Sequence, residues 1–470
     1  MYECYTVEVE GTGLRFAPRK DNGKDIAYLP GQPPKGYTLM NLIGDPGFLH
    51  CAVFRKDGAA GGFFALHDTE GVLFLAVAES NLAYGLGLAH MGRTVTYARY
   101  GADIFEELGL HRYINAQDTF TTYGASCMPA ASLRAMREIA SSCVELAEVQ
   151  AKTGDALAKL THNEGAYISN GAAGGMMVAT AAALARDDEK IFHTLPEITG
   201  PRYEVVMQAA QRNMYDRGCS AVGAKMRYIG TADTAPTVEE LEAAITPATA
   251  AVFYVIFFGR DASLPLETMV EVAHRHGVPV IVDAAAQNPP AENLWKFTGM
   301  GADLVIFSGG KTMRGPQDSG LIVGKKEWID RCRRWGPPTD GVCRGCKTSR
   351  ESIVGLYKAV QLYLQRDEAT LMRTLNRRCA AFERTLRDCG FIQITRTQEG
   401  PVGQVMARTY AVMPYGSAKD LADKMRANGI YIGAEPGNRI LLNPLMVTPA
   451  QVKTVCETLT TCMQQIKEEL

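Results

Sequence analysis

The middle of the chain alternates short apolar runs with amphipathic segments, the pattern of a mostly parallel sheet with crossing helices. Between the apolar runs, hydrophobic residues recur at helical spacing and predict helices, for example at residues 238–245 and 266–276. Two further helices are predicted before the first run, at 130–140 and 144–160. Seven runs are predicted to be strands of one sheet, and the last is expected to return antiparallel: 166–169, 204–208, 225–229, 251–257, 278–283, 303–308 and 320–324.

The two ends of the chain have different patterns, which predict three domains. Residues 346–470 mix helical and strand patterns and are predicted to form a smaller α+β domain. Residues 1–100 show alternating segments at 6–10, 61–66 and 71–77, separated by turn residues, and predict a β-rich accessory domain with one helix near 81–89. Residues 101–345 are then the large α/β domain with its leading segment. For the first domain, a packing or oligomer-contact role is favoured over a ligand sensor.

The composition excludes several functional classes. The 470 residues are 46% hydrophobic and 21% charged, with a net charge of −2 and no long basic block, which argues against a nucleic-acid surface. No apolar stretch reaches the ~18 residues that a membrane span needs, and the start lacks the pattern of a secretory signal. Twelve dispersed cysteines favour reduced thiols in the cytoplasm. The pair Cys343 and Cys346 has no second pair at metal-ligand spacing, so no metal site is predicted.

The most informative stretch follows the predicted strand at 303–308. The strand ends at Ser308, two glycines follow, and then comes a single lysine, Lys311. Burial lowers the pKa of an ammonium group, and a neutral amine can form a Schiff base. The strand at 278–283 ends in Asp283, and a buried carboxylate there needs a cationic partner. Pyridoxal 5′-phosphate supplies both an aldehyde for a lysine and a ring nitrogen for an acid.

A third segment predicts the position of the cofactor phosphate. Residues 164–175 show a strand, a tight turn and then a helix made of Gly, Ala and Met. Small residues at a helix N-terminus expose free N–H groups to an anion. The Ser308 hydroxyl is predicted to add a contact to that phosphate. The order of a phosphate turn, a strand-end acid and Ser-x-x-Lys is much more specific than any one of its parts.

These motifs carry a resemblance to a known family. From about residue 102 onward the chain resembles the selenocysteine-synthase-like branch of fold-type-I pyridoxal-phosphate enzymes, a branch that includes D-glucosaminate (or its 6-phosphate) ammonia-lyases. The segments that carry it are 113–116, 169–175, 282–286, 341–355 and, above all, SGGKTMRGPQDSG at 308–320. The resemblance implies the fold-type-I transferase fold and a homodimer or higher homo-oligomer. Gln117 and Asp118 depart from the family pattern, which has small residues there.

The resemblance also implies roles for individual residues. Lys311 and Asp283 are the predicted catalytic residues, and Gln211 stands where many relatives stack a histidine on the cofactor ring. Arg439 matches the C-terminal-domain arginine that many relatives use for a substrate carboxylate, a role that suits a planar guanidinium. Predicted cofactor contacts are Lys311, Asp283, Ala285, Asn170, Gly171, Ala172, Ala173, Ser308 and Gln211. Predicted substrate contacts are Arg439, Arg314, Thr119 and Thr121. Arg344 and Lys347 match basic family positions near the phosphate.

These parts predict a lyase that acts on a small molecule. Lys311 would take the Cα proton of an amino acid while the cofactor accepts the electrons and Asp283 keeps the ring nitrogen protonated. Loss of a Cβ hydroxyl then gives a 2-keto acid and ammonia from a β-hydroxy amino acid or amino sugar acid. Transamination and racemisation share the early steps and remain alternatives. Selenium transfer on seryl-tRNA is another alternative, which the near-neutral charge disfavours.

Overall fold

The computed structural model describes Phe105 and residues 108–256, 260–400 and 403–470, and between residues 4 and 100 it describes the backbone of the strands. The chain consists of two compact units, residues 1–112 and residues 113–470. The predicted boundaries near residues 100 and 345 stay predictions. No helix among the described residues has the length and apolar character that crossing a bilayer requires.

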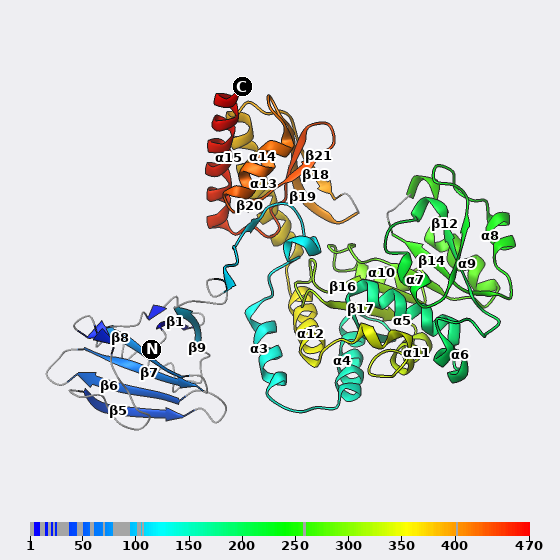
Figure 1. Cartoon of the computed structure of the whole chain (residues 1–470), viewed down its shortest axis with the longest axis horizontal. Coiled ribbons are helices and arrows are strands. Elements are labelled where there is room, and N and C mark those ends of the chain that lie inside the picture. The colour runs from blue at the N-terminus through cyan, green and yellow to red at the C-terminus, as the bar shows by residue number, and fades with distance from the viewer. Residues whose placement is uncertain are drawn as a thin grey trace. The chain divides into compact units, whose positions relative to one another are not determined.

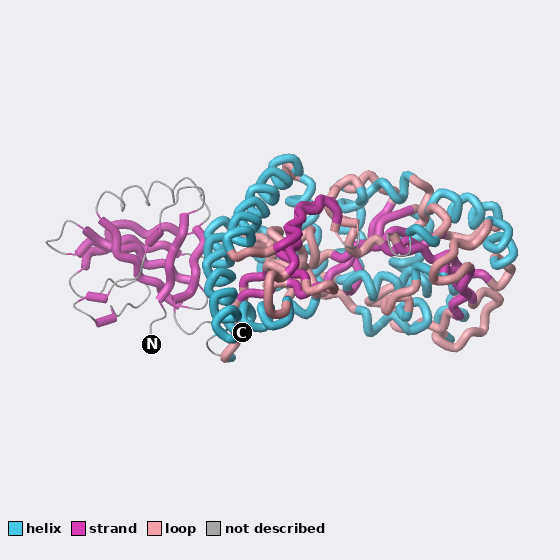
Figure 2. The backbone as a smooth tube through the Cα atoms, turned by 90° about the horizontal axis from the view of Figure 1, so that it is seen from above, coloured by secondary structure: helices cyan, strands magenta, loops and turns pink. Residues whose placement is uncertain are grey.

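The described strands between residues 4 and 100 of the first unit pair antiparallel and are drawn in magenta in Figure 2. Its main sheet has the order β5-β6-β7-β8, while β2-β1-β9 and β3-β4 pair separately. The strands predicted at 6–10, 61–66 and 71–77 are confirmed, whereas the helix predicted near 81–89 lies outside the described residues. The bounds are β1 Cys4–Val9, β2 Arg15–Phe16, β3 Lys20–Asp21, β4 Lys24–Asp25, β5 Tyr37–Gly44, β6 His50–Lys56, β7 Gly61–Asp68, β8 Gly71–Ala78 and β9 Val95–Tyr100.

The second unit contains the predicted seven-stranded sheet, in the order β11-β17-β16-β15-β14-β12-β13 (Figure 1). The pairs from β13 to β16 are parallel, and β17 runs antiparallel to both of its neighbours, as the sequence predicted. The carboxyl ends of the parallel strands therefore meet at one edge, where ligands bind in such sheets. The bounds are β11 Gly165–Asn170, β12 Glu204–Gln208, β13 Lys225–Ile229, β14 Thr249–Val255, β15 Val280–Asp283, β16 Leu304–Ser308 and β17 Ser319–Gly324.

Each face of this sheet is buried in its own core, which explains why the strands are almost continuously apolar. Helices α4, α9 and α12 pack on one face, and α5 and α11 pack on the other. Helix α5 is buried along most of its length, and its Gly and Ala residues let it lie close against the strands. The bounds are α3 Ala130–Ala140, α4 Leu146–Leu160, α5 Gly171–Ala185, α6 Glu189–Thr194, α7 Arg217–Ala221, α8 Val238–Ala244, α9 Leu266–Arg275, α10 Asn293–Gly299, α11 Lys326–Trp335 and α12 Arg350–Leu364.

The C-terminal part is α+β, as predicted, with the antiparallel sheet β18-β19-β22-β21. A third core fills the space between this sheet and its helices. The leading segment of the unit joins it through β10, which pairs parallel with β20. The bounds are β10 Ile114–Asn115, α13 Glu368–Asp388, β18 Ile392–Glu399, β19 Val405–Val412, α14 Ala418–Ala427, β20 Ile430–Tyr431, β21 Gly433–Glu435, β22 Arg439–Leu442 and α15 Pro449–Glu469.

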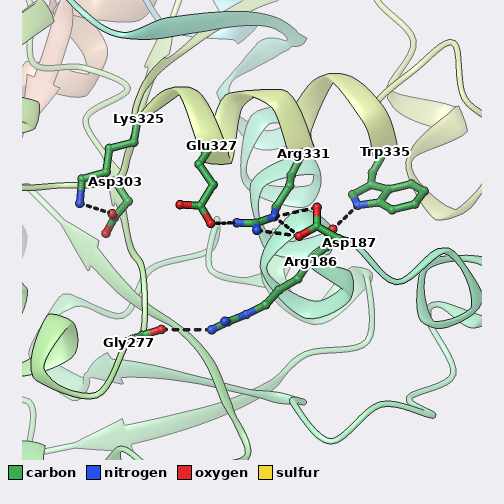
Figure 3. A network of polar contacts seen from close by, with 8 residues as sticks. All are labelled: Arg186, Asp187, Gly277, Asp303, Lys325, Glu327, Arg331 and Trp335. Atoms are coloured by element: carbon green, nitrogen blue, oxygen red, sulfur yellow. Dashed lines mark hydrogen bonds and ion pairs between the residues drawn. The ribbon is translucent and has the colours of Figure 1, made fainter.

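A network of polar contacts fixes α11 against α5 and the start of β16 (Figure 3). Arg331 on α11 binds Asp187, which follows α5, and Trp335 donates to the Arg186 carbonyl. At the other end, Asp303 is 3% exposed and pairs with Lys325 at 2.7 Å. The second Asp303 oxygen accepts the Val280 N–H at 2.7 Å and contacts the His274 ring at 2.8 Å. This carboxylate therefore joins two neighbouring strands and two helical segments.

Replacing Asp303 with alanine is expected to lower the free energy of unfolding by about 2 kcal/mol, since it leaves the buried Val280 N–H without its acceptor. Chemical denaturation of the holoprotein measures the change. Asp187→Ala is the matched control, because this carboxylate is 64% exposed and surface ion pairs contribute about 1 kcal/mol or less. Equal losses in the two variants would contradict the prediction.

Candidate functional site

Lys311 lies in a tight turn just after β16, beyond the edge where the parallel strands end. The turn is closed by backbone bonds from Gly315 to Gly309 at 2.8 Å and from Gly309 to Ser319 at 2.8 Å. Burial lowers the pKa of the Lys311 ammonium, while the negative charges of Asp283 and Asp118 oppose the shift. A lysine whose neutral form is favoured can form a covalent bond to an aldehyde.

Asp283 is the last residue of β15 and is 7% exposed. Burial raises the pKa of its carboxyl group, and the Ala285 N–H and the charge of Lys311 act in the opposite direction. The Ala285 N–H donates to Asp283 Oδ1 at 3.0 Å, and the Ala285 carbonyl accepts from the Ser308 N–H at 3.3 Å. The structure therefore brings together the ends of β15 and β16, which carry three of the predicted residues.

The predicted phosphate turn lies at the junction of β11 and α5. Gly171 has a φ of 60°, and its N–H donates to the Asp318 carbonyl at 2.7 Å. The Asn170 side chain makes no capping bond to α5 and donates to the Lys347 carbonyl at 3.2 Å instead. The N–H groups at the start of this helix thus have no side-chain acceptor, and Ala172 and Ala173 add no bulk over them. Such a helix start can hold a phosphate.

Gln211 lies beside the same strand ends and is 1% exposed. Its Oε1 accepts the Val255 N–H at 3.0 Å, and Val255 is paired with Asp283 across the sheet. Its Nε2 is buried and has no hydrogen-bond partner. A buried donor without a partner needs an explanation, and a bound ligand is one such explanation. Together with the uncapped start of α5, Lys311 and Asp283, Gln211 fits pyridoxal 5′-phosphate, which these residues would hold at phosphate, aldehyde and ring.

The segment after β10 passes over the Lys311 turn. Ser126 donates to the Gly310 carbonyl at 2.6 Å, and Gln317 donates to the Thr121 carbonyl at 2.8 Å. Arg314, which has a φ of 61°, donates through Nε to the Cys127 carbonyl at 2.7 Å. Thr119 is buried and Thr121 is exposed. Their predicted substrate contacts, like that of Arg314, stay predictions.

Arg439 lies at the exposed start of β22, where its Nε donates to the Pro436 carbonyl at 3.2 Å. Its guanidinium carbon lies 5.4 Å from the centre of the Tyr410 ring, on the face of the sheet that also carries Arg408. Arg344 pairs with Asp340. Cys343 is buried, Cys346 packs beside Gly174, and the described residues contain no cluster that could hold a metal ion.

Sequence reasoning missed a buried ion pair near this site. Arg408 on β19 is 0% exposed, and its Nη2 lies 3.0 Å from Oδ2 of Asp118, which is 5% exposed. The negative charge of Asp118 also acts to raise the pKa of the Lys311 ammonium, against the effect of burial. The available signals were the departure of Asp118 from the family pattern and a charged residue inside an apolar strand, which needs a partner.

Comparisons with known proteins agree with this arrangement. The family model described as "SelA: L-seryl-tRNA selenium transferase" matches residues 145–386, more than half of the chain. The chain belongs to the SelA family. The family resemblance predicted from the motifs is therefore confirmed.

Individual relatives are similar to this chain over most of their own length. The D-glucosaminate-6-phosphate ammonia lyase of Salmonella typhimurium is 33% identical over 269 residues, which is 56% of this chain and 70% of that protein. The 5'-C-glycyluridine monooxygenase-decarboxylase of a Streptomyces species is 30% identical over 343 residues, which is 70% of this chain and 83% of that protein.

Among solved structures, D-glucosaminate-6-phosphate ammonia-lyase has a TM-score of 0.68 and 27% identity, covering 78% of this chain and 99% of that one. This likeness and the family match confirm the predicted fold-type-I architecture. They also confirm the predicted cofactor class, pyridoxal 5′-phosphate, and the prediction that the protein is an enzyme.

Proposed function

We propose that this enzyme is an ammonia-lyase that converts a β-hydroxy amino acid or amino sugar acid to a 2-keto acid and ammonia. The observation that carries the proposal is the placement of Lys311 and Asp283 at adjoining strand ends, beside an uncapped helix start. The similarity to an ammonia lyase supports the choice among reactions. Transamination and racemisation need the same two residues, but no observation in the structure favours them.

Lys311 and Asp283 have separate roles in this reaction. When bound, pyridoxal 5′-phosphate accepts electrons from the substrate Cα. Lys311 holds the cofactor and, once released from it, takes the Cα proton on its amine nitrogen. Asp283 keeps a proton on the ring nitrogen, because an opposite charge favours the protonated form. Loss of the Cα proton and the Cβ hydroxyl as water leaves an enamine, and hydrolysis of the enamine yields the 2-keto acid and ammonia.

A substrate screen tests the proposal. The purified holoenzyme is incubated with D-glucosaminate, D-glucosaminate 6-phosphate, L-serine and L-threonine, and 2-keto acid and ammonia are measured separately. The expected result is equal release of both products from at least one compound. In a parallel reaction supplied with 2-oxoglutarate to accept the amino group, keto acid without ammonia would indicate transamination. Inversion at Cα without keto acid would indicate racemisation, and either result contradicts the proposal.

Seryl-tRNA is expected to bind weakly, because the chain has a net charge of −2 and tRNA affinity rests on neutralising phosphates. Filter binding against a salt series measures the affinity, and binding should vanish by about 0.2 M salt. Tight binding that resists salt would instead favour selenium transfer, the activity for which the family model is described.

We also infer that the enzyme works in the cytoplasm as a homodimer or higher homo-oligomer. The free thiols among the described cysteines suit a reducing compartment. Light scattering on the purified protein, which gives the molar mass in solution, tests the oligomeric state against the 51.1 kDa chain.

A further inference from the structure

Two cysteines lie one turn apart in η4, the 3-10 helix Val342–Cys346 that precedes α12. Side chains three positions apart eclipse in a 3-10 helix, so Cys343 and Cys346 project from the same side of η4. Both are free thiols, and Cys343 is 0% exposed whereas Cys346 is half-buried. The pair therefore combines a thiol that a reagent in solution can reach with a buried thiol next to it on the same helix side.

Both side chains face α5, the helix whose start forms the predicted phosphate turn. Cys343 belongs to the core on the α5 face of the sheet, and Sγ of Cys346 lies 3.4 Å from Sδ of Met177 on α5. Cys346 also packs on Gly174, since a Cβ on this glycine would lie 3.4 Å from Cβ of Cys346. The end of η4 is thus packed on the first two turns of α5.

The residue after this pair is bonded to the phosphate turn itself. The Lys347 carbonyl accepts a hydrogen bond from the side chain of Asn170 at 3.2 Å, and Asn170 is the residue before α5. A change in the backbone at Cys346 therefore reaches Asn170 through one residue and one hydrogen bond. A helix start holds phosphate through its free N–H groups, and the flanking backbone sets where these groups point.

We propose that Cys343 and Cys346 form a thiol–disulfide site, at which oxidation by a low-molecular-weight disulfide such as oxidised glutathione weakens cofactor binding at the start of α5. With three residues per turn and a rise of about 2 Å per residue, their Cα atoms are about 6 Å apart, which is within the range of disulfides. Closing the bond brings the sulfur atoms to about 2.05 Å and draws Sγ of Cys346 from its contact with Met177.

The oxidation takes two exchange steps. The half-buried Cys346 loses its proton, and its sulfur attacks one sulfur of oxidised glutathione, whose S–S bond breaks and releases one glutathione thiolate. Cys343 then loses its proton, and its sulfur attacks Sγ of Cys346 and releases the second glutathione thiolate. The two cysteines lose two electrons, which oxidised glutathione gains, and the two protons convert both glutathione thiolates to thiols.

The environment of the two thiols makes this exchange slow. Burial raises the pKa of Cys343 to about 12 and also raises the pKa of Cys346. Little of either thiol is ionised near neutral pH, so the exchange takes on the order of hours. The site therefore responds to a sustained oxidising environment and not to a brief pulse of oxidant, and it is tested at equilibrium.

Peptide mapping tests the bond, because trypsin cuts between the two cysteines. Cleavage after Arg334, Arg344 and Lys347 gives peptides 335–344 and 345–347, which only a disulfide holds together. The holoenzyme is equilibrated without oxygen in mixtures of oxidised and reduced glutathione, and free thiols are blocked before digestion. The expected product is this linked pair of peptides, which dithiothreitol separates.

The same samples report on the cofactor. Oxidation is expected to raise the Kd of pyridoxal 5′-phosphate about 10-fold, as measured by equilibrium dialysis, and reduction should restore the parent value. Cys346→Ser keeps the size of the side chain and prevents the bond, so its Kd should stay within about 2-fold of the reduced parent at every glutathione ratio. Cys343→Ser removes the other sulfur and gives an independent test. Cys456→Ser is the matched control, because it removes a half-buried thiol on α15 and should respond to oxidation as the parent does.

Three results would overturn the proposal. One is a disulfide from Cys343 to Cys332, a thiol of α11 in the same core that trypsin releases in a different peptide. The others are glutathione that stays on Cys346 as a mixed disulfide, and a linked pair of peptides with unchanged cofactor affinity. Neither measurement uses turnover, so their failure leaves the lyase proposal intact, and a failed substrate screen leaves this site intact.

Discussion

Replacing Lys311 with alanine is expected to abolish the covalent link to the cofactor and to lower turnover by about four decades. Two roles are lost at once, because the same amine anchors the cofactor and takes the Cα proton. The structure supports both roles: the turn after β16 buries the amine, and burial lowers the pKa of its ammonium form. A lower pKa leaves a larger fraction of the amine neutral, and only the neutral amine can attack an aldehyde or accept a proton.

Borohydride reduction followed by peptide mass spectrometry measures the link directly. The parent enzyme should show one adduct on the peptide that contains Lys311, and Lys311→Ala should show none. Lys326→Ala is the control, since Lys326 lies on the surface of α11 with 68% exposure and should leave the adduct unchanged. An adduct that persists in Lys311→Ala, or that maps to another lysine, would show that the site has been misplaced.

The sequence predicted the large domain well because its signals are local. Strands with apolar runs and helices with regular spacing were placed within a few residues of their observed ends, including β12 and β16. The missed elements carry mixed signals. No helix was predicted at α11, where arginines surround an apolar side formed by four buried residues: Trp328, Ile329, Cys332 and Trp335.

The sequence could predict those residues of the candidate site that directly follow a strand. Lys311, Asp283 and the start of α5 each follow an apolar run, and parallel pairing brings such ends to one edge of a sheet. The pair of Asp118 and Arg408 could not be predicted in this way, because its members are separated by 290 positions in the chain. Only the antiparallel register of β19 and the pairing of β10 with β20 bring these two charges together.

Arg439 was predicted from a family motif, and its contact with a substrate carboxylate stays a prediction. Its motif matched a family position, and the structure places it on the same face of the C-terminal sheet as Arg408, but at the exposed end of β22. The two arginines differ in their exposure to solvent, since Arg408 is buried and Arg439 is exposed. A guanidinium in water is already hydrated and gains little from one more anion, whereas a buried guanidinium with vacant donors gains much more.

Asp283→Asn is expected to separate cofactor binding from proton removal. Asparagine keeps the size of the side chain and an oxygen for the Ala285 N–H, which Asp283 Oδ1 accepts at 3.0 Å. The variant should therefore bind the cofactor with unchanged stoichiometry and still form the adduct at Lys311. Exchange of the substrate Cα proton with deuterated solvent should fall by two decades or more, which is a loss of about 3 kcal/mol of stabilisation.

The physical reason lies in the charge of the carboxylate and not in its shape. An anion beside the ring nitrogen raises the pKa of that nitrogen, and the protonated ring draws electrons from Cα. Burial of Asp283 opposes its ionisation, whereas the Ala285 N–H and the charge of Lys311 favour the ionised carboxylate. Asp187→Asn, an exposed site, controls for the loss of one charge elsewhere. If Asp283→Asn exchanges Cα protons at the parent rate, the carboxylate only fixes the chain after β15, and another group must supply the charge.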